Sequence, residues 1–275
     1  MMAPIQWPLE AIWEAVVPGL PGFSLEVLPQ IDSTNTELMR RARAGRLEPV
    51  LLVAEHQSAG RGRLGREWLS GQDPAQATGS ARAPLVSLTF SIGLSLAPAD
   101  WSGLSLAVGV SVAHSLHPEL RLKWPNDVWW RDRKMAGILI ETVSLGDASA
   151  ARYAVVGVGI NIAPRDATGL STPPAWLREV LPGADAAQAL LQVAAPLVQA
   201  LKAFETYGFA PFRARFHALD ALDGVPVSLS NGTLGVARGV DVAGALQVHT
   251  AQGLESITSS EVSVRPQRPP SYDNL

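Results

Sequence analysis

Apolar residues recur along the chain with two periods, and each period predicts a different kind of element. Alternating or continuous apolar runs predict strands, because successive side chains of a strand point to opposite faces. Runs of this kind lie at 25–28, 50–54, 85–92, 121–124, 127–130, 136–142 and 153–162. We expect these strands to form a mixed, mostly antiparallel sheet.

Apolar residues spaced three and four apart predict helices that cover this sheet. One short helix is expected near 9–17. In the next helix, Thr34 and Glu37 have the spacing of a capping box, which places the helix N-terminus at this point. Asp100 is the expected N-cap of a third helix. Helices that back a mostly antiparallel sheet make the fold class α+β.

Residues 175–220 continue the helical pattern, with Asp185 as the expected cap of the main helix. Pro196 is expected to kink or divide that helix, because proline removes a backbone hydrogen bond and clashes with the preceding turn. The pattern changes near residue 221 to short alternating segments, and Asn231-Gly232 is a strong hairpin signal. These segments predict a small β-barrel-like module.

The pattern therefore divides the chain into four parts. They are a short N-terminal extension (1–24), a main α+β domain (25–220), a C-terminal β module (221–265) and a proline-rich, disordered tail (266–275). Within the main domain, 70–84 is rich in Gly, Ala, Ser, Gln and Pro, which predicts a mobile surface loop.

Composition narrows the class of protein. The 275 residues are 47% hydrophobic and 17% charged, which is typical of a globular chain that buries a core. A net charge of −3 argues against a dedicated nucleic-acid binder. The absence of cysteine excludes disulfides, zinc–thiolate sites and a thiol nucleophile. We expect a cytoplasmic protein, because neither a signal peptide nor a run of eighteen apolar residues is present.

The segment 60–68, Gly-Arg-Gly-Arg-Leu-Gly-Arg-Glu-Trp, concentrates candidate chemistry. Its glycines let the backbone approach a ligand closely and expose N–H groups. Its arginines supply planar donors that suit carboxylate and phosphate oxygens. Taken alone, the segment fits a solvated basic loop or a nucleic-acid contact better than a small-ligand site, and the rest of the chain reverses that preference.

Other polar residues stand at the ends of neighbouring predicted strands. Lys123 stands just before the turn 125–127, and Lys134 ends the polar run 131–134. Asn161 closes a strand whose glycines allow close backbone approach. The Walker and dinucleotide-binding patterns are absent, and no Ser-His-Asp set, paired glutamates or metal triad can be picked out. The residues therefore favour chemistry by positioning and electrostatic stabilisation.

Five segments in this order resemble those of biotin protein ligases, and the resemblance spans 25–265. They are Asp32-Ser33-Thr34-Asn35, Ala54-Glu55-His56-Gln57-Ser58-Ala59-Gly60-Arg61-Gly62-Arg63, Lys123-Trp124-Pro125-Asn126-Asp127, Lys134-Met135-Ala136-Gly137-Ile138-Leu139 and Gly157-Val158-Gly159-Ile160-Asn161. The resemblance implies the class II synthetase-like fold of biotin and lipoate ligases, with an SH3-like barrel at the C-terminus.

The resemblance also implies a two-step reaction. Biotin and Mg·ATP would give biotinyl-5′-AMP and pyrophosphate. The biotinyl group would then pass to one lysine of the biotin carboxyl carrier protein of acetyl-CoA carboxylase. It implies ATP and Mg²⁺ as cofactors and leaves monomer and homodimer open, with neither DNA nor a membrane as a partner.

By position, the resemblance assigns catalytic, biotin-binding and ATP-binding residues. The implied catalytic residues are Lys134, Arg63 and Lys123. The implied biotin contacts are Ser33, Thr34, Asn35, Gln57, Gly60, Arg61, Gly62, Arg63, Lys134 and Gly137. The implied ATP contacts are Arg61, Arg63, Arg66, Trp68 (near the adenine), Lys123, Asn126, Lys134 and Asn161. The magnesium ligands stay unassigned.

Two departures and two rival functions qualify this assignment. Residues 1–24 are too few for the winged-helix DNA-binding domain of some family members, so we expect a ligase that is not a repressor. Val86 stands where a tyrosine is common. A lipoate-type ligase of the same fold is the nearest rival, and polar Ser33, Thr34 and Gln57 favour biotin over lipoate. A nucleic-acid-binding module is the rival from another class.

Overall fold

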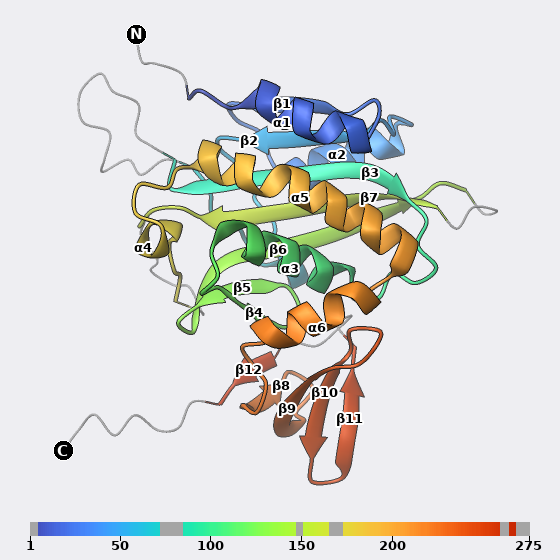
Figure 1. Cartoon of the computed structure of the whole chain (residues 1–275), viewed down its shortest axis with the longest axis vertical. Helices are drawn as coiled ribbons and strands as arrows, with labels where there is room; N and C mark the ends of the chain where they lie inside the picture. The colour runs from blue at the N-terminus through green and yellow to red at the C-terminus, as the bar shows by residue number, and fades with distance from the viewer. Residues whose placement is uncertain (1–4, 72–84, 147–150, 165–172, 259–263, 268–275) are drawn as a thin grey trace.

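The computed structural model describes residues 5–71, 85–146, 151–164, 173–258 and 264–267. Its centre is a seven-stranded sheet in the order β1-β2-β3-β7-β6-β5-β4 (Figure 1). The strands are β1 Ser24–Leu28, β2 Val50–Ala54, β3 Ser87–Leu96, β4 Arg121–Lys123, β5 Asp127–Trp130, β6 Arg133–Ser144 and β7 Arg152–Asn161. Only the pair β1–β2 is parallel among the described strands, so the predicted mostly antiparallel sheet is confirmed.

Helices cover both faces of the sheet, which explains why its central strands are apolar on both sides. The helices are α1 Leu9–Val16, α2 Thr34–Arg43, α3 Leu104–Leu116, α4 Leu177–Val180, α5 Ala186–Tyr207 and α6 Ala210–Leu219. In Figure 1, α3 and α5 lie in front of the sheet and α2 lies behind it. Nearly every residue of β3 and β7 is buried between these layers.

The long helix α5 confirms one prediction and overturns part of another, namely division at Pro196. The carboxylate of Asp185 accepts a hydrogen bond from the N–H of Gln188 at 2.8 Å, so Asp185 is the N-cap as predicted. The helix continues through Pro196 without division, and the break before α6 falls at Gly208 instead. Buried residues on both sides of the proline, including Leu197, tie the helix to the core and offset the lost hydrogen bond.

The predicted start of α2 at Thr34 is confirmed, whereas the predicted cap of α3 was wrong. Ser33 caps α2, since its hydroxyl accepts from the N–H of Thr36, while the Thr34 side chain turns to Gln57. Glycine 103 caps α3 with a left-handed φ of 80°. Asp100 instead accepts from the N–H of Ser102. In α3 a neighbouring contact outcompeted the cap that the local sequence predicted.

The strand β6 begins earlier than its apolar pattern predicted. Arg131 and Asp132 form the tight turn after β5 with φ of 47° and 59°, and the strand starts at Arg133. Lys134 therefore lies within a strand, where its backbone is held by neighbours on both sides. Its N–H donates to the carbonyl of Pro173, and its carbonyl accepts from Ala175.

The C-terminal module is a second, five-stranded antiparallel sheet in the order β11-β10-β9-β8-β12. Its strands are β8 Pro226–Leu229, β9 Leu234–Val240, β10 Leu246–Thr250, β11 Gly253–Ile257 and β12 Val264–Pro266. The predicted hairpin at Asn231-Gly232 is confirmed, with Gly232 at φ +90°. The module lies below α6 and β4 in Figure 1.

Some predictions fall outside the described residues. Most of the predicted loop 70–84, namely 72–84, lies outside them, and so does the tail from 268 to 275. None of the helices in the described part of the chain combines the length and the apolar character that crossing a bilayer requires.

Candidate active site

One cavity of about 1170 Å³, counted with its open mouth, gathers the residues that the sequence singled out. It opens between the N-terminus of α2, the glycine–arginine loop, β6, β7 and the turn before β5. The predicted residues on its wall are Ser33, Thr34, Asn35, Gln57, Arg61, Gly62, Arg63, Arg66, Trp68, Lys123, Asn126, Lys134, Gly137 and Asn161. Gly60 is the one predicted residue that does not reach this wall.

Gly60 and Trp68 close the base of the glycine–arginine loop. The N–H of Trp68 donates to the carbonyl of Gly60 at 2.9 Å. A Cβ at Gly60 would stand 2.1 Å from the Trp68 carbonyl oxygen, so only glycine fits there. The indole of Trp68 lies over the glycines of β6 and β7, because a Cβ on Gly159 would be 2.2 Å from its ring. Its predicted contact with adenine stays a prediction.

One end of the cavity is lined by uncharged hydrogen-bonding groups, and we call it the neutral end (Thr34, Asn35, Gln57 and the adjoining Ser91). The N–H and hydroxyl of Thr34 lie 2.8 and 3.1 Å from Gln57 Oε1. The Ser91 hydroxyl lies 2.7 Å from both Thr34 Oγ1 and Asn35 Oδ1. All four side chains are buried, so each contact is shielded from water.

The orientation of Asn35 is fixed by its amide nitrogen. Nδ2 donates to the carbonyl of Leu139 at 3.2 Å and to Glu141 Oε2 at 3.0 Å, which turns Oδ1 toward Ser91. A Cβ on Gly157 would stand 2.1 Å from Asn35 Oδ1. The glycine of β7 therefore makes the room that this amide occupies.

The contacts at the neutral end need one more hydrogen than its hydroxyl groups supply. Three contacts link Gln57 Oε1, the Thr34 hydroxyl, the Ser91 hydroxyl and Asn35 Oδ1 in a row. Both ends of the row are carbonyl oxygens, so the two hydroxyls supply two hydrogens for three contacts. The row is one donor short. A ligand that brings N–H or O–H groups suits it better than one that brings acceptors only.

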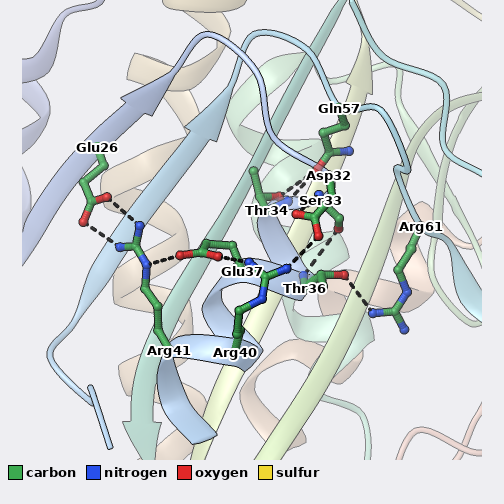
Figure 2. Close-up of polar contacts among 10 residues, drawn as sticks. All are labelled: Glu26, Asp32, Ser33, Thr34, Thr36, Glu37, Arg40, Arg41, Gln57 and Arg61. Carbon is green, nitrogen blue, oxygen red and sulfur yellow. Dashed lines mark hydrogen bonds and ion pairs between the residues drawn. The ribbon is translucent and has the colours of Figure 1, made fainter. Parts of the chain in front are cut away.

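Arg61 turns its guanidinium toward β6 and α2. Its Nη2 and Nη1 lie 2.9 and 3.3 Å from the Glu141 carboxylate. Figure 2 shows its other bond, from Nη1 to Thr36 Oγ1 at 3.3 Å. Glu141 thus holds both Arg61 and Asn35. This pairing joins the glycine–arginine loop to the neutral end through one carboxylate.

Further ion pairs follow the exposed side of α2 (Figure 2). Arg41 forms a bidentate pair with Glu26 at 2.7 and 2.9 Å and also contacts Glu37. Arg40 pairs with Asp32 at 2.7 Å, next to the helix cap. The hydrogen bond from Arg41 leads the interactions that hold the pKa of Glu37 below its ordinary value. These contacts tie the helix to β1 and to the segment before it.

The opposite end of the cavity carries basic side chains around one carboxylate, and we call it the cationic end (Arg63, Arg66, Lys123 and Lys134 around Asp127). Lys134 Nζ lies 2.6 Å from Asp127 Oδ1, and Lys123 Nζ lies 3.9 Å from Oδ2. Antiparallel pairing of β4, β5 and β6 brings the three residues together. One carboxylate thus serves two ammonium groups.

Burial governs the charges at the cationic end. Burial lowers the pKa of Lys123, and the nearby Asp127 only partly restores it. Burial likewise lowers the pKa of Arg63, again with partial compensation from Asp127. Positive neighbours, Arg66 among them, add to the lowering at both residues. Within the described residues, five basic side chains and two carboxylates line the whole cavity, which favours anionic ligands.

Two asparagines at the cavity wall donate hydrogen bonds to backbone carbonyls of β6, the strand that carries Lys134. Asn126 Nδ2 donates to the carbonyl of Ile138 at 2.7 Å, and Asn161 Nδ2 donates to the carbonyl of Lys134 at 3.0 Å. Their predicted contacts with the nucleotide stay predictions. The observed bonds position the strand that carries Lys134.

Sequence reasoning missed three residues that organise the cavity: Ser91, Glu141 and Asp127. Ser91 interrupts an apolar strand with a fully buried hydroxyl, and that polar break was the available signal. Asp127 belonged to a quoted segment, but its two lysine partners come from the strands on either side. Glu141 gave no signal of its own, because its partners lie 80 and 106 residues away in the chain.

The possible metal ligands and the lysines are two further features that bear on the chemistry of the site. Within the described ranges, no group of three or more His, Cys, Asp or Glu side chains is arranged to hold a metal ion. The chain contains three lysines. Lys123 and Lys134 line the cavity, and Lys202 lies on α5, where it pairs with Glu205.

Two family models match the chain. Residues 27–161 match the Biotin/lipoate A/B protein ligase family, and residues 225–265 match the Biotin protein ligase C terminal domain. The first match contains nearly all of the cavity wall, and the second coincides with the C-terminal sheet.

Three relatives give the degree of likeness. The Bifunctional ligase/repressor BirA of Escherichia coli (strain K12) is 37% identical over 257 residues, which cover 90% of this chain and 75% of the relative. The Biotin–[acetyl-CoA-carboxylase] ligase of Paracoccus denitrificans is 33% identical over 86% of this chain and 98% of its own length. The solved Biotin protein ligase from Aquifex aeolicus in complex with biotin and ATP aligns with a TM-score of 0.70 and 29% identity, over 89% of this chain and 99% of that one.

Proposed function

Because this chain belongs to the biotin protein ligase family and is therefore a ligase, we propose that it joins biotin to a lysine of a carrier protein through biotinyl-5′-AMP. The observation that carries this proposal is the division of one cavity into a neutral end and a cationic end. A molecule with an uncharged hydrogen-bonding head and an anionic tail matches that division.

In this proposal the neutral end holds the ureido ring of biotin. The ring brings two N–H donors and one carbonyl, and the row from Gln57 to Asn35 is one donor short. Ser33 and Thr34 at the N-terminus of α2 read the head together with Gln57. The valeryl chain then runs past Trp68 and Gly137 toward the cationic end.

The first step brings two anions together. A carboxylate oxygen of biotin attacks the α-phosphorus of ATP, the bond from that phosphorus to the bridging oxygen breaks, and pyrophosphate leaves. Lys134 bridges the carboxylate and the α-phosphate, while Lys123, Arg63 and Arg66 receive the remaining phosphate charge. Fixed cations in a partly dry site offset the repulsion without reorganising during the reaction.

Magnesium fits the cationic end as a companion of ATP. The ion needs few protein ligands, because it keeps waters and binds phosphate oxygens. Asp127 offers a carboxylate, 11% exposed, whose Oδ2 lies 3.9 Å from Lys123 Nζ, and Asn126 on the same cavity wall offers an amide oxygen. When bound, the ion would neutralise phosphate charge.

In the second step the ε-amine of a carrier lysine attacks the carbonyl carbon of biotinyl-5′-AMP. The bond from that carbon to the phosphate oxygen breaks, AMP leaves and the amine loses a proton. The glycine–arginine loop, with Arg61 held by Glu141, shields the mixed anhydride from water until the lysine arrives. We propose the biotin carboxyl carrier protein of acetyl-CoA carboxylase as the acceptor.

A lipoate-type ligase is the rival within the same fold. The head of lipoate is a disulfide ring without N–H groups, so it cannot supply the one hydrogen that the row of buried oxygens at the neutral end lacks. An unpaired buried acceptor costs about 1–3 kcal/mol. The neutral end therefore favours biotin, and the same reasoning disfavours octanoate.

Label transfer tests the proposed function directly. Purified protein is incubated with ATP, radiolabelled biotin and an unmodified carrier domain, and label on the carrier is measured. We expect transfer that depends on ATP and is lost when the target lysine of the carrier is replaced by arginine. Labelled lipoate serves as the parallel substrate. Absence of label from biotin, or stronger label from lipoate, would contradict the proposal.

A further inference from the structure

The turn between β9 and β10 of the C-terminal module reaches the main domain beside the cationic end. Trp124 lies between Lys123 and Asp127 in the chain, and its side chain is 1% exposed. Its indole Nε1 donates to the carbonyl of Gly244 at 3.1 Å. We call 122–127 the cationic segment, because it carries Lys123 and Asp127 of the cationic end. A buried residue of this segment is thus hydrogen-bonded to the backbone of the C-terminal module.

This turn has a fixed conformation. The Asp241 carboxylate accepts from the N–H groups of Ala243 and Ala245, both at 2.9 Å. The N–H of Gly244 donates to the Asp241 carbonyl at 3.1 Å. Gly244 itself has a φ of +82°, which favours glycine. The carbonyl that meets Trp124 is therefore presented by a rigid turn.

The turn also lies directly against the start of α3. A Cβ on Gly244 would stand 2.9 Å from Gly103 Cα and 3.1 Å from Leu106 Cδ1. Gly103 has no space to retreat, because a Cβ on it would stand 2.6 Å from the ring of Phe209. The two glycine backbones are in contact, and the turn is wedged between α3 and Trp124.

Two further attachments hold the module beside β4. In α6, Arg213 Nε donates to the Val240 carbonyl at 3.2 Å, and His217 Nε2 lies 3.1 Å from the same oxygen. In the linker, the N–H of Ala221 donates to the carbonyl of Leu122 at 2.9 Å, one residue before Lys123. The module therefore contacts the cationic segment through its own turn and through its linker.

We propose that the β9–β10 turn is a positioning element of the reaction, in which Gly244 fixes Trp124 and thereby places Lys123 and Asp127. This inference rests on the proposed function, because it assigns the turn to the nucleotide side of that site. The hydrogen bonds of the described turn lead to Trp124 or stay within 241–247, and none of them reaches a residue of the neutral end. Disturbing the turn should weaken the use of ATP and leave the binding of biotin unchanged.

Three variants of the full chain test the proposal. Gly244→Ala forces a Cβ against Gly103, and Trp124→Phe removes the indole donor while keeping an aromatic ring. Gly232→Ala is the matched control, because Gly232 also has a positive φ, +90°, in a turn of the same module, and its Cβ would meet nothing within 4 Å. Biotin affinity is measured by calorimetry without nucleotide. The KM for ATP and kcat are measured by biotin-dependent exchange of pyrophosphate into ATP.

We expect kcat/KM for ATP to fall on the order of 100-fold in Gly244→Ala and about tenfold in Trp124→Phe. Biotin affinity should stay within about twofold in both, and Gly232→Ala should behave like the unmodified protein. Equal ATP kinetics in Gly244→Ala and Gly232→Ala would overturn the positioning role. If Gly244→Ala fails to fold, unchanged ATP kinetics in Trp124→Phe would overturn it equally. Absence of exchange in the unmodified protein would instead refute the proposed function.

Discussion

The two ends of the cavity solve opposite physical problems. At the neutral end, four buried side chains bond to one another, and the arrangement is one hydrogen short. At the cationic end, basic groups crowd around Asp127, and burial lowers the pKa of Lys123 despite that carboxylate. One end lacks a donor and the other lacks negative charge.

This difference indicates how recognition and chemistry are divided. A missing donor selects a ligand by shape and hydrogen-bond pattern, since the energetic penalty falls on ligands that cannot supply it. The excess of positive charge at the cationic end attracts many anions and stabilises the negative charge that develops during a reaction. Variants at the two ends should therefore separate biotin affinity from adenylation.

The largest effect is expected at Lys134. Replacing Lys134 by alanine removes the cation that we propose bridges the two reacting anions, and it leaves Asp127 without its 2.6 Å partner. Adenylate formation, measured by exchange of pyrophosphate into ATP, should fall by on the order of 10³-fold or more. Lys202→Ala removes the lysine outside the cavity and should leave the rate unchanged. Turnover of Lys134→Ala at the unmodified rate would contradict the bridging role.

A smaller but selective effect is expected from Ser91→Ala at the neutral end. The change removes the hydroxyl that bonds Asn35 Oδ1 and leaves that buried oxygen without its donor. The Kd for biotin should rise about 20-fold, and the Kd for ATP should not change. Ser95→Ala is the control, because Ser95 is an exposed serine of the same strand. Equal losses of biotin and ATP affinity in Ser91→Ala would remove the distinction between the two ends.

Arg63→Gly should affect retention of the intermediate. Arg63 lies on the glycine–arginine loop and contributes a half-buried charge to the cationic end. Its loss should accelerate release of biotinyl-5′-AMP about tenfold with a smaller change in its formation. Rapid filtration of labelled adenylate measures the release. An unchanged release rate would count against closure by this loop.

A pH series should affect the two ends differently. Because burial lowers the pKa of Lys123, its charge is lost at a lower pH than that of an ordinary lysine. ATP affinity should therefore decline severalfold as pH rises from about 7 to about 9.5, whereas biotin affinity changes less. Lys123→Arg keeps the charge and should flatten the ATP profile. Parallel profiles for both ligands would indicate a shared cause elsewhere.

The smallest effect is expected from Glu141→Gln. The exposed part of the Arg61–Glu141 pair is screened by solvent, so loss of its charge should speed biotin release by only about threefold. Glu26→Gln breaks a bidentate pair of similar geometry on the far side of α2 and serves as the control (Figure 2). If both variants release biotin at the same rate, Glu141 does not link the loop to the neutral end.

Local sequence predicted the strands and the contiguous motifs well, because period and turn chemistry are local properties. Lys123 and Lys134 were found in this way, and their convergence follows from antiparallel pairing of β4, β5 and β6. What local sequence could not supply is the partner of each side chain. Thr34 has the sequence context of a cap, yet its hydroxyl bonds Gln57, a residue 23 positions away.

The same limit explains the residues that were missed. Ser91 and Glu141 gain meaning only when β3 and β6 come beside α2, which depends on the order of strands in the whole sheet. Pro196 shows the converse case. A strong local helix breaker was overridden because tertiary packing on both sides holds α5 together.

The placement of the lysines has a consequence for the fate of the proposed biotinyl-5′-AMP. An acyl phosphate that escapes the cavity reacts with amines, and the side-chain amine available outside the cavity is that of Lys202. The remaining basic side chains are arginines, whose guanidinium groups keep their protons and are poor nucleophiles. The protein thus carries ample positive charge on side chains that react poorly with an acyl phosphate, so self-labelling of side chains should converge on the peptide that contains Lys202.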